Sequence, residues 1–225
     1  MILRPDLPFD LLVFDWDGTL MDSEARIVAC MERAIEDINL PKRSREEIKN
    51  IIGLGLQEAI DTLFPEEGKR HYQQIIERYR HHYLEEDKTP SQLFAQSEAV
   101  VTLLQRDYLL AIATGKGRIG LNKVLAETGI GHLFHISRCA DEAFSKPHPQ
   151  MLLEVMANCG VEAERTLMIG DTEYDMEMGK NAGTATLAVT YGVHAVQRLL
   201  RYEPCGTIDD IGELPMFLQT DRTKL

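Results

Sequence analysis

The sequence predicts an α/β fold in which a doubly wound, Rossmann-like parallel sheet carries an inserted all-helical segment. From about residue 89 onward, short apolar runs alternate with stretches of helical periodicity, which is the pattern of a parallel sheet covered on both faces by helices. Between about residues 21 and 91 the periodicity is helical throughout. We therefore expect a core domain formed by residues 1–20 and 92–225, and a helical cap domain formed by residues 21–91.

The first strand is expected at the apolar run of residues 9–13, and the helical segment follows it. Asp22 or Ser23 can cap a first helix that runs to about Leu40. Ser44 then starts a second helix, with Glu47 placed as a capping acid.

The glycine-containing segment 53–55 interrupts the helical periodicity, and two further helices are expected after it, at residues 56–64 and 68–86. The last of these carries an apolar stripe that we expect to pack in a core. Its members are Tyr72, Ile75, Ile76, Tyr79, His82 and Tyr83.

The remaining elements follow the alternation expected of a parallel sheet with right-handed crossovers. Strands are expected at residues 108–113, 134–137, 166–170 and 184–190, and helices at 97–105, 117–128, 148–158, 173–182 and 211–219. Polar clusters follow several of these strands. Because open α/β sheets bind their ligands at the carboxyl ends of the strands, these clusters should meet at one edge.

The most informative cluster is the segment FDWDGTL at residues 14–20. Burying Asp15 and Asp17 at a strand end is unfavourable unless a cation pairs with them. An ionised Asp15 suits a nucleophile, because it needs no deprotonation at neutral pH. Asp17 has the spacing for a general acid/base, and Gly18 allows a tight turn. The alternative is a strand that simply ends in an Asp-Gly turn.

Two further clusters supply groups that suit phosphate binding. The Thr114 hydroxyl and the Gly115 N–H can donate to phosphate, although Thr114 also suits an ordinary N-cap. Lys146 can pair with phosphate and carboxylates, and its alternative is a surface lysine.

The surroundings of these groups carry their own expectations. Pro147 should lie in the first turn of a helix and fix where Lys146 points. Lys116 and Arg118 are placed where they could touch a substrate, but we expect them to form a solvated helix start.

The last cluster, at residues 170–175, follows the strand expected at 166–170 and contains Asp171 and Asp175. Carboxylate oxygens are ligands that Mg²⁺ prefers, so both residues are candidate magnesium partners. The alternative is an acidic helix N-terminus, where aspartate is favoured in any case.

In this order the four clusters resemble the four motifs of the haloacid dehalogenase superfamily, in its phosphoglycolate phosphatase-like subgroup with a helical cap. The resemblance implies a magnesium-dependent phosphatase that acts through an aspartyl-phosphate on small phosphate esters. It implies direct metal contacts from the side chains of Asp15 and Asp171 and from the backbone carbonyl of Asp17, with Asp175 acting through water or orientation. Residues 51–56 resemble the substrate loop of that subgroup. Phosphoglycolate, sugar phosphates and nucleoside monophosphates all stay open as substrates.

Several alternatives remain open beside this interpretation. Dehalogenases of this fold lack the second aspartate, and phosphonoacetaldehyde hydrolases share Trp16 but carry alanine where Asp17 stands. Sugar phosphomutases of this cap type carry a histidine about where Ile27 lies, so mutase chemistry is less favoured. A non-catalytic phospho-ligand-binding relative and a long-lived phosphoaspartate switch are the two remaining classes. The presence of both Asp15 and Asp17 argues against the first, and the helical insertion together with Asp17 argues against the second.

Composition limits partners and location. The formal charge of −12, with no basic block, argues against a nucleic acid or an anionic membrane as the partner. The N-terminus lacks a signal-peptide pattern and no apolar run reaches membrane-helix length. The four cysteines form no Cys-x-x-Cys pair, which predicts reduced thiols in the cytoplasm. The oligomeric state is not predicted.

Overall fold

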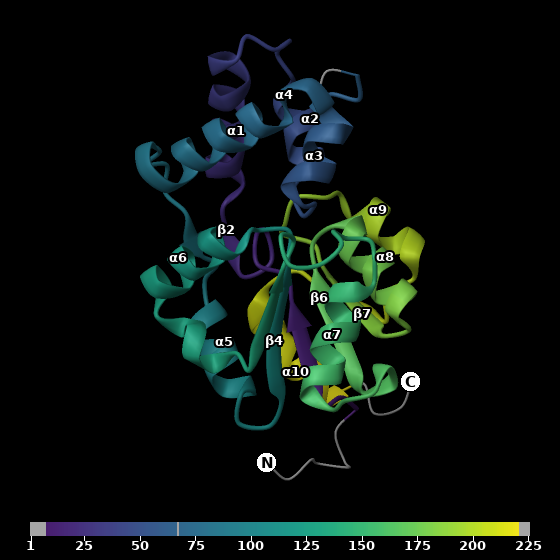
Figure 1. The fold of residues 1–225 in the computed structure, drawn as a ribbon. Coiled ribbons are helices and arrows are strands. Elements are labelled where there is room, and N and C mark those ends of the chain that lie inside the picture. The colour runs from purple at the N-terminus through teal and green to yellow at the C-terminus, as the bar shows by residue number, and fades with distance from the viewer. Residues whose placement is uncertain (1–7, 67, 221–225) are drawn as a thin grey trace.

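The computed structural model describes residues 8–66 and 68–220, and its centre is a six-stranded, all-parallel sheet (Figure 1). The strand order is β5-β4-β1-β6-β7-β8, so the chain builds one half outward from β1 and then returns to build the other. This confirms the doubly wound fold and places a topological switch point at the end of β1. The strands are β1 (Leu11–Phe14), β4 (Leu109–Thr114), β5 (Ile136–Cys139), β6 (Thr166–Gly170), β7 (Ala185–Val189) and β8 (Gly206–Ile208).

Alternate side chains of the strands feed two apolar layers. On one face, Leu12 and Phe14 pack with helices α5 (Ser97–Leu104), α6 (Arg118–Thr128) and α10 (Leu214–Thr220). On the other, Leu11 and Val13 pack with α7 (Gln150–Cys159) and α8 (Glu173–Ala182). Because β1 is covered on both faces, its residues are fully buried, and the polar groups that follow it lie at the sheet edge rather than in solvent.

The helical segment of residues 24–86, which lies between β1 and α5 in the chain, forms a layer above that edge (Figure 1). It contains α1 (Glu24–Asp37), α2 (Arg45–Asn50), α3 (Leu56–Leu63) and α4 (Gly68–His81), which a π-helical turn (His82–Glu86) extends. These helices share their own apolar cluster. It includes five of the six residues in the predicted stripe of α4 and its extension, and His82 is the one left out. The predicted capping box of Ser44 and Glu47 is present. The division into two domains stays a prediction.

The ends of the helical segment differ from expectation. Two short strands, β2 (Met21–Asp22) and β3 (Gln92–Leu93), pair antiparallel where the segment leaves and rejoins the core. Strands of two residues are too short to show the alternation on which sequence analysis depends. Ser23 occupies the N-cap position of α1, but its hydroxyl does not cap the helix.

Other departures have local causes. Pro147 lies three residues before α7 and outside its first turn, because Pro149 takes the N-cap position. The final helix is divided into a 3₁₀ turn (Ile211–Glu213) and α10, since Pro215 fits only a first helical turn. The short strand β8 and helix α9 (Val196–Leu199) were not predicted. Within the described residues, the helices are all too short or too polar to cross a membrane.

Candidate active site

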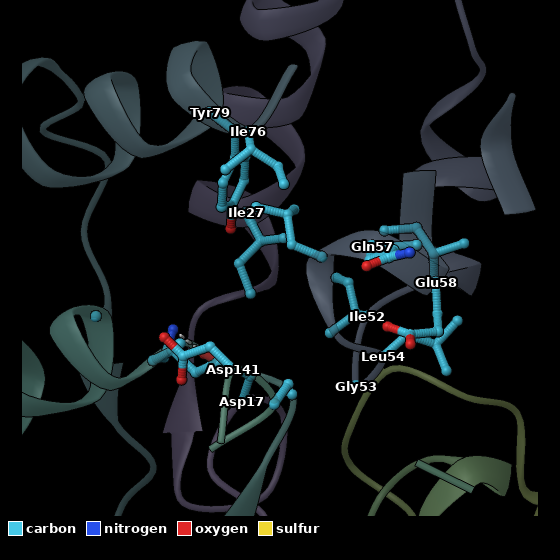
Figure 2. A pocket seen from close by; sticks show the side chains of 18 of the residues that line it. Asp17, Ile27, Ile52, Gly53, Leu54, Gln57, Glu58, Ile76, Tyr79 and Asp141 are labelled. Atoms are coloured by element: carbon cyan, nitrogen blue, oxygen red, sulfur yellow. Dashed lines mark ion pairs between the residues drawn. The ribbon is translucent and has the colours of Figure 1, made fainter. Parts of the chain in front are cut away.

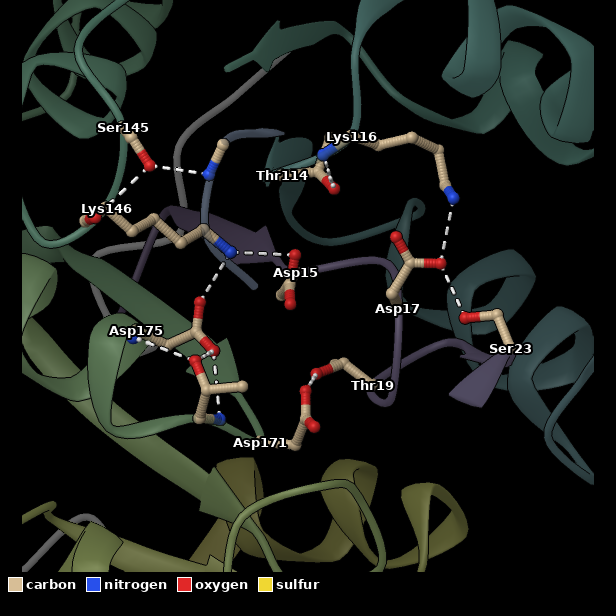
Figure 3. A network of polar contacts seen from close by, with 12 residues as sticks. Asp15, Asp17, Thr19, Ser23, Thr114, Lys116, Ser145, Lys146, Asp171 and Asp175 are labelled. Carbon is tan, nitrogen blue, oxygen red and sulfur yellow. Dashed lines mark hydrogen bonds and ion pairs between the residues drawn. The ribbon is translucent and has the colours of Figure 1, made fainter. Parts of the chain in front are cut away.

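Four sequence-predicted residues meet in one buried group at the carboxyl edge of the sheet (Figure 3). Asp15 follows β1, Asp171 follows β6, Asp175 lies in the first turn of α8, and Lys146 comes from the loop before α7. All four are buried. Because β1 and β6 are hydrogen-bonded neighbours in register, the residues that follow them emerge side by side.

Lys146 is the cation at the centre of this group. Its Nζ lies 2.7 Å from Asp15 Oδ1 and 2.6 Å from Asp175 Oδ1, and its side chain has no exposed surface. Burial alone would lower the pKa of Lys146, but the two carboxylates outweigh it and raise that pKa above its usual value. The ammonium therefore stays charged, and the surface-lysine alternative is wrong.

Asp15 is held with unused bonding capacity. Neither of its buried oxygens accepts a well-aligned hydrogen bond, and Lys146 contacts only Oδ1. Burial raises the pKa of Asp15 well above its usual value, Lys146 opposes this rise, and Asp175 and Asp171 add to it. An ionised Asp15 therefore calls for a further cation or a group that donates to it.

Asp171 and Asp175 are bound by the protein in different ways. Asp171 accepts hydrogen bonds from the Thr19 hydroxyl and the Val193 N–H, both at 2.8 Å. Burial, with Asp175 nearby, raises the pKa of Asp171 to about 7. Asp175 Oδ2 accepts from the N–H and hydroxyl of Thr172, which forms a capping box at the start of α8, while Oδ1 takes Lys146. Asp175 therefore does occupy a helix N-terminus, as the alternative predicted, and it also contacts Lys146.

The donor set suits a hard divalent cation. Asp15, Asp171 and Asp175 each offer a carboxylate oxygen, and these atoms lie within 4.8 Å of one another. The single ammonium of Lys146 offsets only part of the charge of three ionised carboxylates, so the group has an excess of negative charge. Mg²⁺ favours such oxygen ligands and completes its shell with water and substrate. The side chain of Asp17 lies outside this set.

Asp17 instead belongs to a second polar group. Its Oδ1 accepts a hydrogen bond from the Ser23 hydroxyl at 2.5 Å and lies 3.0 Å from Lys116 Nζ (Figure 3). Lys116 also donates to the Tyr83 hydroxyl at 2.9 Å. Asp17 is therefore linked, through Lys116, to the helical segment above it.

Lys116 corrects an expectation. Its side chain is 7% exposed, so it does not form a solvated helix start. Burial would lower the pKa of Lys116, but Asp17 raises it well above the usual value, so this ammonium is also charged. Arg118 is half-buried and pairs with Glu142 at 2.7 Å. The available signal was the position of Lys116 inside a polar cluster, directly after Thr114 and Gly115.

Thr114 and Gly115 lie at the end of β4, next to Asp15 and Asp17. The buried Thr114 hydroxyl accepts a hydrogen bond from the Lys116 N–H at 3.2 Å, while Gly117 is the N-cap of α6, so the N-cap alternative is wrong for Thr114. A Cβ on Gly115 would lie 2.4 Å from the Gly53 carbonyl oxygen. Only glycine permits this contact between the core and the helical segment.

The loop of residues 50–55 is held against the core by hydrogen bonds that sequence analysis missed. The Gly55 N–H donates to the Ser145 hydroxyl at 2.7 Å, and the Tyr174 hydroxyl donates to the Asn50 carbonyl at 2.8 Å. His194 lies between the same carbonyl, at 3.3 Å, and the Glu173 N–H, and burial lowers its pKa. The loop residues and their partners in the core are 90 to 144 residues apart in sequence, so no local pattern reveals these bonds.

A cavity of about 510 Å³ lies between the polar site and the helical segment (Figure 2). Asp15 and Asp17 form part of its floor, and apolar side chains of the helical segment form most of its walls. Tyr72, Ile76 and Tyr79 of the predicted packing stripe line it, so the stripe serves the cavity as well as the apolar cluster.

Comparison with known proteins agrees with this geometry. A family model described as haloacid dehalogenase-like hydrolase matches residues 12–189. The probable phosphatase IndB of Dickeya dadantii is 33% identical over 210 residues, which are 91% of each chain. The phosphoglycolate phosphatase of Haemophilus influenzae is 31% identical and covers 92% of this chain and 96% of its own. The crystal structure of a predicted phosphoglycolate phosphatase from Haemophilus somnus superimposes with a TM-score of 0.82, at 25% identity over 93% of this chain and 98% of that one.

Proposed function

This chain belongs to the haloacid dehalogenase-like hydrolase family, and from that premise we propose that it is a magnesium-dependent phosphatase of small phosphate monoesters that acts through an aspartyl-phosphate. Members similar to it are named phosphatases, and the chain is a hydrolase of phosphate esters. The observation that carries the finer proposal is Asp15, a buried carboxylate with unused oxygens between a charged lysine and two further carboxylates.

In the first step a carboxylate oxygen of Asp15 attacks phosphorus, and the bond from phosphorus to the ester oxygen breaks. Lys146, the Thr114 hydroxyl and the Gly115 N–H would hold the phosphoryl oxygens, which spreads the developing charge over fixed donors. Asp17 donates a proton to the departing alcohol. Its separate position, outside the carboxylate cluster, leaves it facing the cavity where the alcohol would lie.

In the second step Asp17, now a carboxylate, takes a proton from water, and the water oxygen attacks the phosphorus of the aspartyl-phosphate. The bond between Asp15 and phosphorus breaks, inorganic phosphate is released and Asp15 is regenerated. The contacts with Lys116 and with the Ser23 hydroxyl hold the Asp17 side chain at the cavity floor, and the contact with Lys116 is a full ion pair in the second step, when Asp17 is a carboxylate.

The residues present fit a bound Mg²⁺. Asp15 and Asp171 would hold it with their side chains and Asp17 with its backbone carbonyl, while Asp175, whose two oxygens already hold Lys146 and Thr172, would act through water or orientation. When bound, the ion supplies positive charge that offsets the carboxylates and the phosphoryl group.

The first test is phosphate release from a panel of small phosphate esters, measured with Mg²⁺ and then with excess chelator. We expect release that needs Mg²⁺ and disappears in Asp15→Asn, while Asp22→Asn, which changes an exposed aspartate outside the site, retains it. Turnover that survives Asp15→Asn would refute the assigned nucleophile.

A second test separates a phosphatase from a long-lived phosphoaspartate switch. In Asp17→Asn the aspartyl-phosphate should form from a reactive donor such as acetyl phosphate but persist, because the base for its hydrolysis is absent. In the wild type it should decay within seconds. A long-lived wild-type phosphoenzyme would favour the switch.

Two further residue types bear on the choice between hydrolase and mutase and on the location of the protein. Ile27, where mutases of this cap type carry a histidine, lines the cavity as an apolar wall and has no proton to exchange, which supports hydrolysis. The thiols of Cys30, Cys139 and Cys159 form no disulfide and support a cytoplasmic protein.

A further inference from the structure

We propose that the cavity selects an uncharged alcohol with an apolar or aromatic face, and disfavours esters whose alcohol carries a second anionic group. This inference rests on the proposed function, because it assigns the part of the substrate that leaves when Asp15 takes the phosphoryl group. Its basis is the position, the walls and the charge of the cavity.

The position of the cavity makes it the space for the alcohol. It opens directly from Asp15 and Asp17, and Asp17 lies between the buried carboxylates and the helical segment (Figures 2 and 3). An ester whose phosphate lies against Asp15 and Lys146 must point its alcohol past Asp17 into this space. A volume of about 510 Å³ is far larger than a two-carbon alcohol needs and is in the range of pockets that hold ring-sized groups.

Apolar side chains form most of the walls. Ile27, Ile76 and Tyr79 project from one side, and Ile52 and Leu54 project from the other (Figure 2). Burial raises the pKa of Tyr79 well above its usual value, so its phenol stays neutral. Such walls favour a ring or an alkyl group, which gives up water without losing hydrogen bonds.

The charge of the lining opposes a second anion. Among the residues that the structure describes, the acidic ones on the lining are Asp15, Asp17, Glu58 and Asp141, and the cationic ones are Lys116 and Arg80. Lys116 is held by Asp17 and by the Tyr83 hydroxyl, and Arg80 is exposed. A carboxylate on the alcohol would therefore be desolvated beside Asp15, Glu58 and Asp141, and it would have to compete with these two partners for Lys116, the one buried cation among the described lining residues.

The experiment compares esters that share the phosphate and differ in the alcohol. The Mg²⁺-loaded enzyme is given benzyl phosphate, ethyl phosphate and 2-phosphoglycolate, with acetyl phosphate as a probe of phosphoryl transfer that needs little of the cavity. We expect kcat/KM to be at least about tenfold higher for benzyl phosphate than for 2-phosphoglycolate, with ethyl phosphate between them.

A matched pair of variants tests the role of charge. Gln57→Lys adds a cation at an exposed position on the cavity lining, and Gln73→Lys makes the same change at an exposed position of α4 outside it. Gln57→Lys should shift the ratio of the two kcat/KM values about tenfold toward 2-phosphoglycolate. Gln73→Lys should leave that ratio unchanged.

The outcomes separate the inference from the function beneath it. If 2-phosphoglycolate is hydrolysed as efficiently as benzyl phosphate, or both lysine variants shift the ratio equally, the inference is overturned while the phosphatase stands. If neither acetyl phosphate nor any ester is turned over with Mg²⁺, the proposed function fails and the inference falls with it.

Discussion

Replacing Gly115 by alanine would separate the loop of residues 50–55 from the residues of the core that we propose bind phosphate. The added Cβ would lie 2.4 Å from the Gly53 carbonyl oxygen and 2.5 Å from that of Leu54, whereas ordinary contact begins at 3.4 Å. Both obstacles are backbone atoms, so no side chain can rotate away. The loop must retreat by about 1 Å, and a misplacement of that size lowers rates by about a hundredfold.

The substitution isolates the steric effect, because alanine keeps the backbone N–H that we assign to phosphate binding. We expect Gly115→Ala to lower kcat/KM for the preferred ester by about a hundredfold, with the far-UV circular dichroism spectrum unchanged. Steady-state phosphate release measures this. A matched control is Gly131→Ala, because Gly131 precedes β5, at the opposite end of the strands from the site, and the three atoms nearest to the new methyl group all belong to the Leu125 side chain, starting at 3.3 Å. Activity of Gly115→Ala within about threefold of the wild type would refute a required contact between loop and core.

Three further predictions concern the buried lysine, the bound metal and the buried histidine. Lys146→Met should abolish turnover. In urea titrations without Mg²⁺ it should also lower the free energy of unfolding by about 3–5 kcal/mol, because Asp15 and Asp175 lose their cation. An unchanged urea midpoint would contradict the pairing. Mg²⁺ at about a hundred times its dissociation constant should add about 2.7 kcal/mol, or about 5–10 °C in melting temperature, in the wild type and not in Asp171→Asn. Burial lowers the pKa of His194 below its usual 6.5, so the stability linked to neutral His194 is present above pH 6.5 and is lost as the pH falls further. The melting temperature of the wild type should therefore fall more steeply below pH 6.5 than that of His194→Asn, and parallel curves would refute this.

The buried cluster could be predicted from the sequence because its members occupy places that the fold dictates. Asp15 and Asp171 directly follow apolar runs, and parallel strands end at one edge, so their proximity follows from the order of elements. Lys146 could be placed there only with the help of the family resemblance, since its own surroundings are ambiguous. Its side chain is fully buried, which a single lysine in a loop does not reveal.

What could not be predicted depends on contacts between distant segments. Lys116 was expected in solvent, but Tyr83 of the helical segment helps to bury it. Tyr83 lies 33 residues earlier, so the sequence around Lys116 does not reveal this contact. The anchoring of Asn50 by Tyr174 joins residues 124 apart. Such pairs follow from how the helical segment sits on the core, and periodicity describes each helix without describing that placement.

The ribbon of β2 and β3 has an evolutionary consequence. Met21 pairs with Leu93, and the Phe94 N–H donates to the Leu20 carbonyl, so the chain departs from the core and returns to it at one point. Closing a loop there depends only weakly on how many residues the loop contains. Descendants can therefore lengthen, shorten or exchange most of the segment between the two strands while the atoms around Asp15 keep their arrangement, provided that Ser23 still holds Asp17 and residues 53–54 still meet Gly115. Under the proposed function, the residues that transfer the phosphoryl group belong mainly to one part of the chain and those that surround the alcohol mainly to another, so new substrates can arise while the chemistry is kept.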